Sequence, residues 1–255
     1  MSGRKLAGFT LLLLTILASC QKPVGTVCAH FSFSVGDEPL EYDTCKYVNA
    51  AGNTYEVQDV QFFVSEVWLK RSDGRRFRMG ENFGVHYVDK DIPESLTWSS
   101  GESIPVGRYN EVSFVFGLDD GHNVSQLFPN APENNMSWPA SLGGGYHYMK
   151  INGKWRNENG EKQPFALHLG AGMGLDETGT LWQRIDNSFV VTLPLTDFYV
   201  SEDSKTQLNL NMDLNQWFEN PETFDFNVYG GSIMQNQAAQ ELLRSNGWNV
   251  FSVIP

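Results

Sequence analysis

Apolar and polar residues alternate along most of this chain, with the two-residue period that is typical of half-buried β-strands. Phe31, Phe33 and Val35 alternate with Ser32 and Ser34 in the first such segment. The same alternation predicts further strands within residues 55–69, 84–89, 107–117, 146–151, 164–169, 188–195, 207–214 and 248–253. Turns are predicted between them at Asp119-Asp120-Gly121, Asn152-Gly153 and Asn159-Gly160. The pattern therefore predicts a domain built of many short strands.

One segment near the C-terminus has helical spacing instead. Its apolar residues fall near one helical face: Ile233, Met234, Ala238, Leu242 and Leu243. Gly247 would end this helix, and a short helical turn is expected at 214–218. Many strands followed by a short C-terminal helix predict an all-β fold, a β-sandwich of the Greek-key type. Since the chain has no internal repeat and no long low-complexity linker, residues 28–255 are expected to form one domain.

The N-terminus has the pattern of a bacterial lipoprotein signal. Arg4 and Lys5 precede a mostly apolar stretch, 6–17, that is too short to span a bilayer as a helix. Small residues then lead into a cysteine in Leu17-Ala18-Ser19-Cys20. We expect residues 1–19 to be removed and the new N-terminal cysteine to receive a lipid. An ordinary secretory signal with an incidental cysteine is the alternative.

Lipidation of Cys20 would place the chain in the cell envelope, outside the inner membrane. Gln21 stands where an aspartate would favour retention in the inner membrane, so we expect an outer-membrane anchor, facing the periplasm or the cell surface. Residues 20–27 would form a tether. In this oxidising compartment Cys28 and Cys45 are expected to form a disulfide. Two cysteines alone supply too few ligands for a thiolate metal site.

The charge of the chain argues against nucleic acid as a partner. The formal net charge is −12. Removal of residues 1–19 takes away two positive charges and no negative ones, which gives −12 − 2 = −14. Such a surface repels phosphate groups and attracts cations or cationic proteins. Plain solubility is the simpler explanation of the acidic composition.

Five segments, in order along the chain, carry a resemblance to a known family. They are 62–69 with the turn at Asp73-Gly74, then 85–89, 105–119, 136–153 and 165–170. The most specific parts are Gly145-Tyr146 and His168-Leu169-Gly170. Together they resemble the MbnP-like copper-binding domain family over almost the whole predicted mature chain.

The resemblance implies a secreted or lipid-anchored β-sandwich that binds copper. In some members it also implies a MauG-like dihaem protein as partner, which oxidises a tryptophan to kynurenine. Met136 and Trp138 match the family pattern Met-x-Trp-x-Trp, whereas Ala140 occupies the second tryptophan position. We therefore expect a copper-binding protein that is not an enzyme, with Trp138 as a redox-active or site-covering ring.

Copper binds imidazole nitrogen and, in its reduced state, thioether sulfur. His168 is the first candidate ligand, because it lies on the face of its predicted strand opposite the apolar residues. His147 lies on the preceding strand, and the two rings would approach each other if these strands pair as a hairpin. His30 would add a third imidazole and Met136 a thioether. The alternatives are histidines that bond a loop or face solvent, a surface methionine, and a Trp138 that packs at the sandwich edge.

Other functions remain open from the sequence. An envelope β-sandwich could hold a protein or glycan partner without metal, and the tryptophans spread along the chain permit a sugar-stacking surface. The oxygen-rich segment 119–123 would suit calcium, but it lacks the full spacing of a calcium loop, and a plain turn is favoured. No Ser/His/Asp arrangement, phosphate-binding glycine loop or Cys-x-x-Cys motif stands out, so an enzyme is the weakest alternative.

Overall fold

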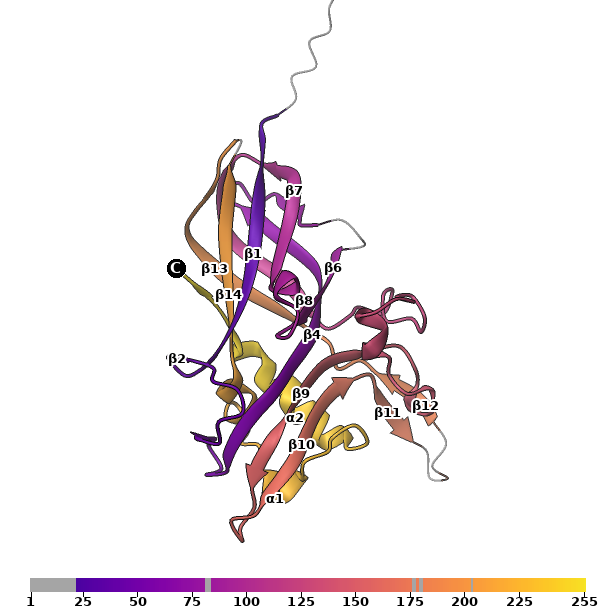
Figure 1. Ribbon diagram of the computed structural model, residues 1–255. Helices are drawn as coiled ribbons and strands as arrows, with labels where there is room; N and C mark the ends of the chain where they lie inside the picture. Colours follow the sequence, from indigo (N-terminus) through magenta and orange to yellow (C-terminus); the bar gives the residue numbers. More distant parts are fainter. Residues whose placement is uncertain (1–21, 81–83, 176–177, 179–180, 203) are drawn as a thin grey trace, which may run out of the picture.

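Strands dominate the computed structural model, which describes residues 22–80, 84–175, 178, 181–202 and 204–255. They form two main sheets and a separate two-stranded ribbon (Figure 1). The two sheets share one apolar core, so the predicted all-β sandwich is confirmed. The predicted signal peptide, 1–19, and Cys20 lie outside the described residues.

The smaller sheet is centred on its first strand, β1. Among the described residues its strands are β1 (Val24–Val35), β2 (Glu38–Pro39), β7 (Thr97–Pro105), β14 (Lys205–Asp213) and β15 (Phe251–Ile254). β1 pairs in parallel with β14, which places Phe31 beside Leu210, and antiparallel with β7. Because β1 begins at Val24, residues 24–27 belong to the sheet, and the prediction of a tether is wrong for them.

The larger sheet is organised around β4, the long strand that links the lower and upper parts of the molecule in Figure 1. The strands of this sheet that the structure describes are β3 (Tyr47–Val48), β4 (Thr54–Arg71), β5 (Arg76–Arg78), β6 (Val85–Asp89), β8 (Gly107–Phe116), β9 (His147–Arg156), β10 (Lys162–Gly170) and β13 (Phe189–Val200). The first half of β4 pairs with β9 and the second half with β8. β10 extends the sheet beyond β9 as an antiparallel hairpin. The ribbon consists of β11 (Gly172–Leu175) and β12 (Leu181–Ile185).

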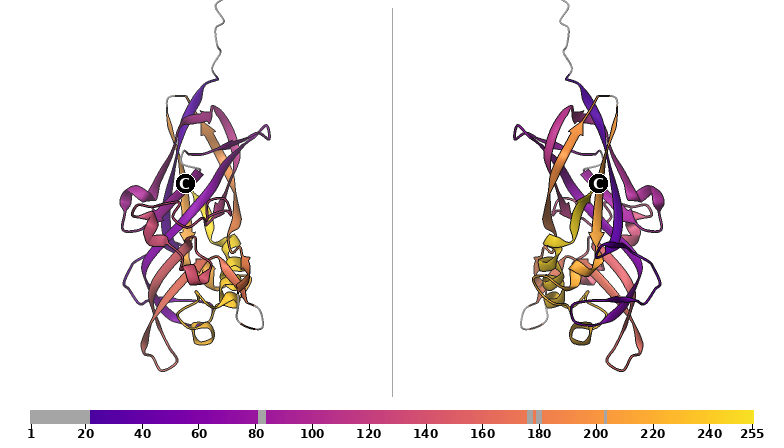
Figure 2. Two further views of the ribbon diagram at one scale, coloured as in Figure 1. Left: turned by 90° about the vertical axis from the view of Figure 1, so that its right-hand side faces the viewer. Right: turned by 90° about the vertical axis from the view of Figure 1, so that its left-hand side faces the viewer.

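Helices are short and lie mainly in connections and near the C-terminus. They are η2 (Pro93–Leu96), η3 (Glu133–Met136), η4 (Ala140–Leu142), η5 (Leu214–Phe218), α1 (Phe226–Tyr229), α2 (Gln237–Asn246) and η6 (Gly247–Asn249). The α-helices gather at the end of the molecule away from the first residues of β1 (Figure 2). α2 begins later than the apolar spacing predicts, because the Asn236 side chain accepts a hydrogen bond from the Ala239 amide and caps it. The predicted turn at 214–218 is η5.

No helix in the described part of the chain has the length and apolar character needed to cross a membrane.

Two apolar clusters lie on opposite faces of β4. Phe62 points between the sheets, where its ring contacts those of Phe31 and Phe116. Its neighbour Phe63 points to the outer face, as strand geometry requires. There it joins a second cluster made of Phe63, Tyr87, Leu118, Met136, Tyr146 and Tyr148. Since Leu118, Met136 and Tyr146 come from the connection between β8 and β9, this connection covers the outer face of the larger sheet.

The predicted disulfide is absent, because Cys28 and Cys45 are free thiols. Cys28 is buried within β1, between β14 and β7. The strand continues from Cys28 to Val35 over about 23 Å, at roughly 3.3 Å per residue. Cys45 follows in the turn before β3, which pairs with the first residues of β4. A disulfide joins Cα atoms that are only about 4–7 Å apart. Cys28 and Cys45 lie at different heights along the sandwich, so they are too far apart to form one.

Candidate metal site

Two histidine rings face each other across β9 and β10. In this antiparallel pair His168 lies opposite Lys150, and His147 lies opposite Gly170. The register shifts just before Gly170, which without the shift would face Tyr148. This bulge turns His147 towards the face that carries His168. The ring centroids are 5.1 Å apart and the ring planes are nearly perpendicular, at 85°.

Each ring is oriented by a hydrogen bond to an oxygen acceptor. Nδ1–H of His147 donates to the carbonyl oxygen of Met136 over 2.9 Å, and Nε2–H of His168 donates to Oδ1 of Asn152 over 2.8 Å. The Asn152 amide is oriented in turn by a 3.4 Å bond from its Nδ2 to Asp59. Because these acceptors fix the tautomers, Nε2 of His147 and Nδ1 of His168 keep their lone pairs. Within the described residues, Nδ1 of His168 is buried without a hydrogen-bond partner.

Both imidazoles are neutral over the physiological pH range. Burial lowers the pKa of His147 to about 3 and the pKa of His168 to about 4, from an ordinary value of 6.5. The positive charge of Lys150 lowers both pKa values further in the same direction. Neutral imidazole is the form that binds metals, so these rings need no deprotonation before a metal binds.

Trp138 packs against the His147 ring from the connection that precedes β9. Its indole meets the His147 ring edge to face at a centroid distance of 4.7 Å, and its Nε1–H donates to the Leu142 carbonyl over 2.9 Å. The indole can pack this closely over β10 only because residue 170 is glycine. A Cβ atom on Gly170 would lie 2.6 Å from the indole. Since the Trp138 side chain is buried, it shields the His147 imidazole from water on this side.

The other two predicted ligands have different places in the structure. Met136 contacts His147 through its carbonyl oxygen, and its side chain is buried in the second apolar cluster. His30 is exposed on β1, where its Nδ1 lies 3.3 Å from Oγ1 of Thr97. The prediction that His30 supplies a third ligand is wrong, because it points away from the shared core on the other sheet.

Two residues of the site were not predicted from the sequence. Asn152-Gly153 is not the predicted turn but lies within β9, where a Cβ on Gly153 would lie 2.0 Å from the carbonyl oxygen of Glu56. Because Asn152 lies on β9 and not in a turn, its side chain can accept the hydrogen bond from His168. Lys150 lies opposite His168 and donates from Nζ to the Asn135 carbonyl over 2.6 Å. Alternation alone placed Lys150 on a strand but gave no sign of its neighbour across the hairpin.

These histidines and Trp138 lie within a segment that matches one family model. The model of the MbnP family matches residues 24–235. The chain belongs to the MbnP family. Among solved structures, MbnP from Methylosinus trichosporium has a similar fold, with a TM-score of 0.53 and 17% sequence identity, covering 79% of each chain. No curated protein sequence matches the chain.

The donor atoms of this MbnP-family site fit copper. An unsatisfied buried nitrogen costs about 1–3 kcal/mol, and a metal ion that accepts the lone pair on Nδ1 of His168 would remove this cost. Copper accepts imidazole nitrogen in both of its oxidation states. Each of the two rings also has the outer hydrogen bond that typically orients a metal-binding histidine.

Proposed function

We propose that this MbnP-family protein binds copper through Nε2 of His147 and Nδ1 of His168, and that it acts without turnover. The observation that supports the proposal is the pair of neutral imidazoles, 5.1 Å apart, each with one nitrogen held by the protein and the other retaining its lone pair. Trp138 would cover the bound ion, and Met136 would contribute through its carbonyl, which accepts the hydrogen bond from Nδ1–H of His147.

The reduced ion, Cu(I), suits this environment better than Cu(II). Both nitrogen donors are uncharged, so they do not offset the charge of the metal. The Lys150 ammonium group acts on both histidines. Its Coulomb repulsion is about twice as large for a divalent as for a monovalent ion at the same position. Partial burial beside an indole strengthens this difference, because the effective dielectric constant is lower there than in water.

The test is an anaerobic titration of the mature domain with Cu(I) in competition with a Cu(I) chelator, repeated with Cu(II). We expect one Cu(I) per chain. His147→Gln and His168→Gln should each lower the affinity for copper by more than about 100-fold. Loss of a residue that only hydrogen-bonds a metal ligand typically lowers metal affinity by 10–100-fold. His30→Gln is the matched control, because His30 is exposed on the other sheet. Failure of the parent chain to retain either copper state would overturn the proposal and favour a metal-free module that binds a protein or glycan.

We also propose a lipid anchor on Cys20, in the outer membrane, on the basis of Leu17-Ala18-Ser19-Cys20. Since β1 begins at Val24, the domain would lie close to the membrane surface. Metabolic labelling with a fatty-acid analogue should mark the parent protein but not the Cys20→Ala variant, which should leave the membrane fraction. Equal labelling of both proteins would contradict the anchor.

For the partner we propose a MauG-like dihaem protein, as the family resemblance implies. Trp138 is only 3% exposed, so a haem outside the domain cannot touch its ring, and oxidation would have to proceed through intervening side chains. The test compares the intact mass of the chain produced with and without a co-expressed MauG-like dihaem protein. We expect a mass change that Trp138→Phe abolishes. An unchanged mass would contradict a modifying partner.

A further inference from the structure

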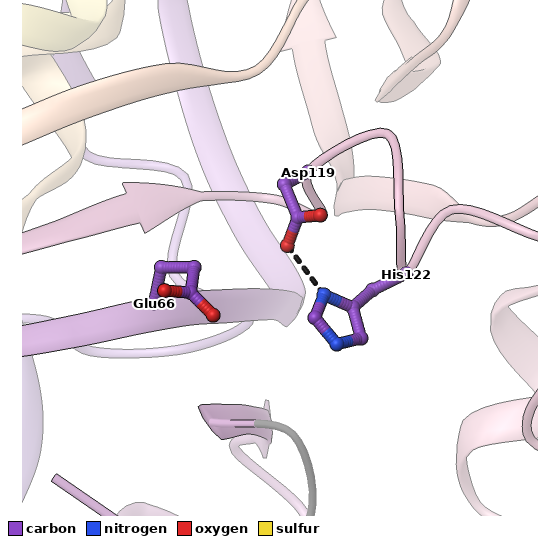
Figure 3. Close-up of side chains that lie close together, drawn as sticks. All are labelled: Glu66, Asp119 and His122. Carbon is purple, nitrogen blue, oxygen red and sulfur yellow. Dashed lines mark hydrogen bonds and ion pairs between the residues drawn. The ribbon is translucent and has the colours of Figure 1, made fainter. Parts of the chain in front are cut away.

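A second group of metal-binding side chains lies where β4 passes the end of β8. One potential ligand atom from each of Glu66, Asp119 and His122 lies within 4.8 Å of the others (Figure 3). All three residues are half-buried, so an ion could reach them from solvent. Glu66 belongs to β4, and the other two belong to the turn that follows β8. None of them takes part in the site formed by His147 and His168.

Two hydrogen bonds hold the turn beside β4. The Gly117 amide donates to the Phe63 carbonyl over 2.8 Å, and the Ser65 hydroxyl donates to the Gly117 carbonyl over 3.0 Å. Within the turn, Oδ1 of Asp119 accepts a hydrogen bond from the Gly121 amide over 2.8 Å. The second carboxylate oxygen, Oδ2, lies 2.5 Å from Nδ1 of His122. Asp119 and His122 are thus positioned by local bonds before any ion binds.

Glu66 is brought to the same place by an irregularity in β4. The pairing of β4 with β8 shifts register between Ser65 and Trp68, which is the mark of a β-bulge. Glu66 occupies this bulge with a φ of +48°, a conformation that non-glycine residues seldom adopt. Its carboxylate accepts bonds from Nε1 of Trp68 at 3.2 Å and from Arg78 at 3.5 Å. The strained backbone directs the carboxylate towards the turn.

We propose that Glu66, Asp119 and His122 form a second metal site, which binds a divalent cation of the zinc type. One imidazole and two carboxylates are a donor set that Zn²⁺ and other first-row divalent ions accept, with water completing the coordination. Two carboxylates offset the charge of a divalent ion. The imidazoles of the proposed copper site are uncharged and cannot do so. A calcium site is disfavoured, because Ca²⁺ takes six to eight oxygen ligands. The two sites therefore differ in the charge and softness of the ion that they suit.

An ion at this second site would also fasten the connection over the outer face of the larger sheet. Asn123 directly follows His122, and its Oδ1 accepts a bond from the Tyr146 amide over 2.8 Å. Its Nδ2 donates to the Tyr148 hydroxyl over 2.8 Å. These two tyrosines flank His147 in the sequence. We therefore expect Zn²⁺ to raise the unfolding temperature of the chain.

The test is a calorimetric titration of the mature chain with Zn²⁺, in a background that carries His147→Gln and His168→Gln so that the copper site cannot contribute. We expect one Zn²⁺ per chain and a fall in affinity of at least about tenfold in each of Glu66→Gln, Asp119→Asn and His122→Gln. Asp197→Asn is the matched control, since Asp197 is an exposed carboxylate that also has a positive φ, +51°. Its Zn²⁺ affinity should equal that of the parent.

Glu66→Gly separates loss of a ligand from loss of structure. Glycine adopts the backbone conformation of this bulge without strain, so the variant should unfold at or above the parent temperature in metal-free buffer. It should nevertheless lose the increase in unfolding temperature that Zn²⁺ gives. Absence of Zn²⁺ binding in the parent, equal binding by the ligand variants, or tighter binding of Ca²⁺ than of Zn²⁺ would each overturn the proposal. None of these results depends on whether copper binds at the first site.

Discussion

The two imidazoles of the proposed copper site owe their orientation to hydrogen bonds with oxygen acceptors. Asn152 accepts from His168, and the Met136 carbonyl accepts from His147. Each bond determines which nitrogen carries the proton and hence which one can bind a metal. The ligand function of these histidines therefore depends on neighbours that bind no metal themselves.

Replacement of Asn152 by alanine should lower copper affinity while the fold persists. The His168 ring would lose the acceptor that fixes its tautomer, and the loss of such an outer partner typically costs 10–100-fold in metal affinity. Chelator competition measures the change. Asn209→Ala is a suitable control, because the Asn209 side chain bonds the carbonyl of Pro255 in the other sheet. Equal copper affinity in Asn152→Ala and the parent would show that Asn152 does not orient the ring.

Substitution of Gly170 by alanine should displace the indole of Trp138. The new Cβ would lie 2.6 Å from a ring atom, so we expect a loss of about 1–3 kcal/mol in the free energy of unfolding, as for other overpacked sites. Urea denaturation measures it. In a Trp138→Leu background the same substitution should cost less, because the clashing ring is gone. An equal cost in both backgrounds would mean that the clash lies elsewhere.

Lys150 should influence which oxidation state of copper is preferred. Loss of its charge in Lys150→Met removes a repulsion that acts more strongly on the divalent ion, so Cu(II) affinity should rise about tenfold more than Cu(I) affinity. Lys150→Arg retains the charge and should leave the ratio of the two affinities near that of the parent. Parallel titrations with both ions measure this ratio, and a ratio that stays constant in Lys150→Met would refute the electrostatic role.

Most strands could be predicted from alternation, and the exceptions have physical explanations. β7 was not predicted, because its sequence, Thr97 to Pro105, alternates poorly and contains an internal glycine. β11 was missed because it contains two glycines in its four residues. The approach of His147 and His168 was predicted from a hairpin, but the bulge that makes it possible was not. A one-residue shift in register is a property of the pairing of two strands, which a single strand does not reveal.

The proposed second metal site shows the same limit of sequence reasoning. The segment 119–123 was recognised as a turn rich in oxygen ligands. Glu66 was part of a predicted strand and attracted no attention, because nothing in the alternation indicates a bulge. The ligands come together only through the pairing of β4 with β8. The local sequence pattern thus drew attention to the turn that contains Asp119 and His122, but it did not indicate their proposed role as metal ligands.

Asn123 links the connection between β8 and β9, which covers the outer face of the larger sheet, to the start of β9. Its removal should lower the stability of the protein. The residue is 1% exposed and bonds Tyr146 and Tyr148. Asn123→Ala leaves the Tyr146 amide without its acceptor and removes one of the hydrogen bonds of the Tyr148 hydroxyl, so the free energy of unfolding should fall by about 1–3 kcal/mol. Asn227→Ala is the control, because Asn227 is exposed. Urea denaturation that gives the same midpoint for both variants would contradict this role.

One buried and two half-buried histidines make the stability of the metal-free protein depend on pH. Burial lowers the pKa of His86 to about 4, and it acts likewise on His147 and His168. The unfolded chain binds protons on these side chains as the pH falls through 6.5, whereas the folded chain does not until the pH approaches the lowered pKa values. The unfolded state therefore binds more protons in this window, and stability falls as the pH falls.

We expect the His86→Gln variant to show a flatter dependence of stability on pH than the parent. His86 accounts for about 2 kcal/mol of the loss between pH 6.5 and pH 5, since each pKa unit corresponds to about 1.4 kcal/mol. The difference in slope is the relevant quantity, because the substitution also changes the packing between Phe31 and Trp98. Denaturation at several pH values measures it, and parallel curves for the two proteins would refute the assignment.

The parallel pairing of β1 with β14 determines when the protein can fold during its synthesis. Phe31 lies beside Leu210, so the first strand has no neighbour on that side until nearly all of the chain has left the ribosome. At the usual rates of elongation the delay between the two strands is roughly 10–35 s. Until then the first strand can pair only with β2 and β7 on its other side, so the smaller sheet stays incomplete. That is the condition in which a nascent polypeptide can be threaded through a narrow export channel.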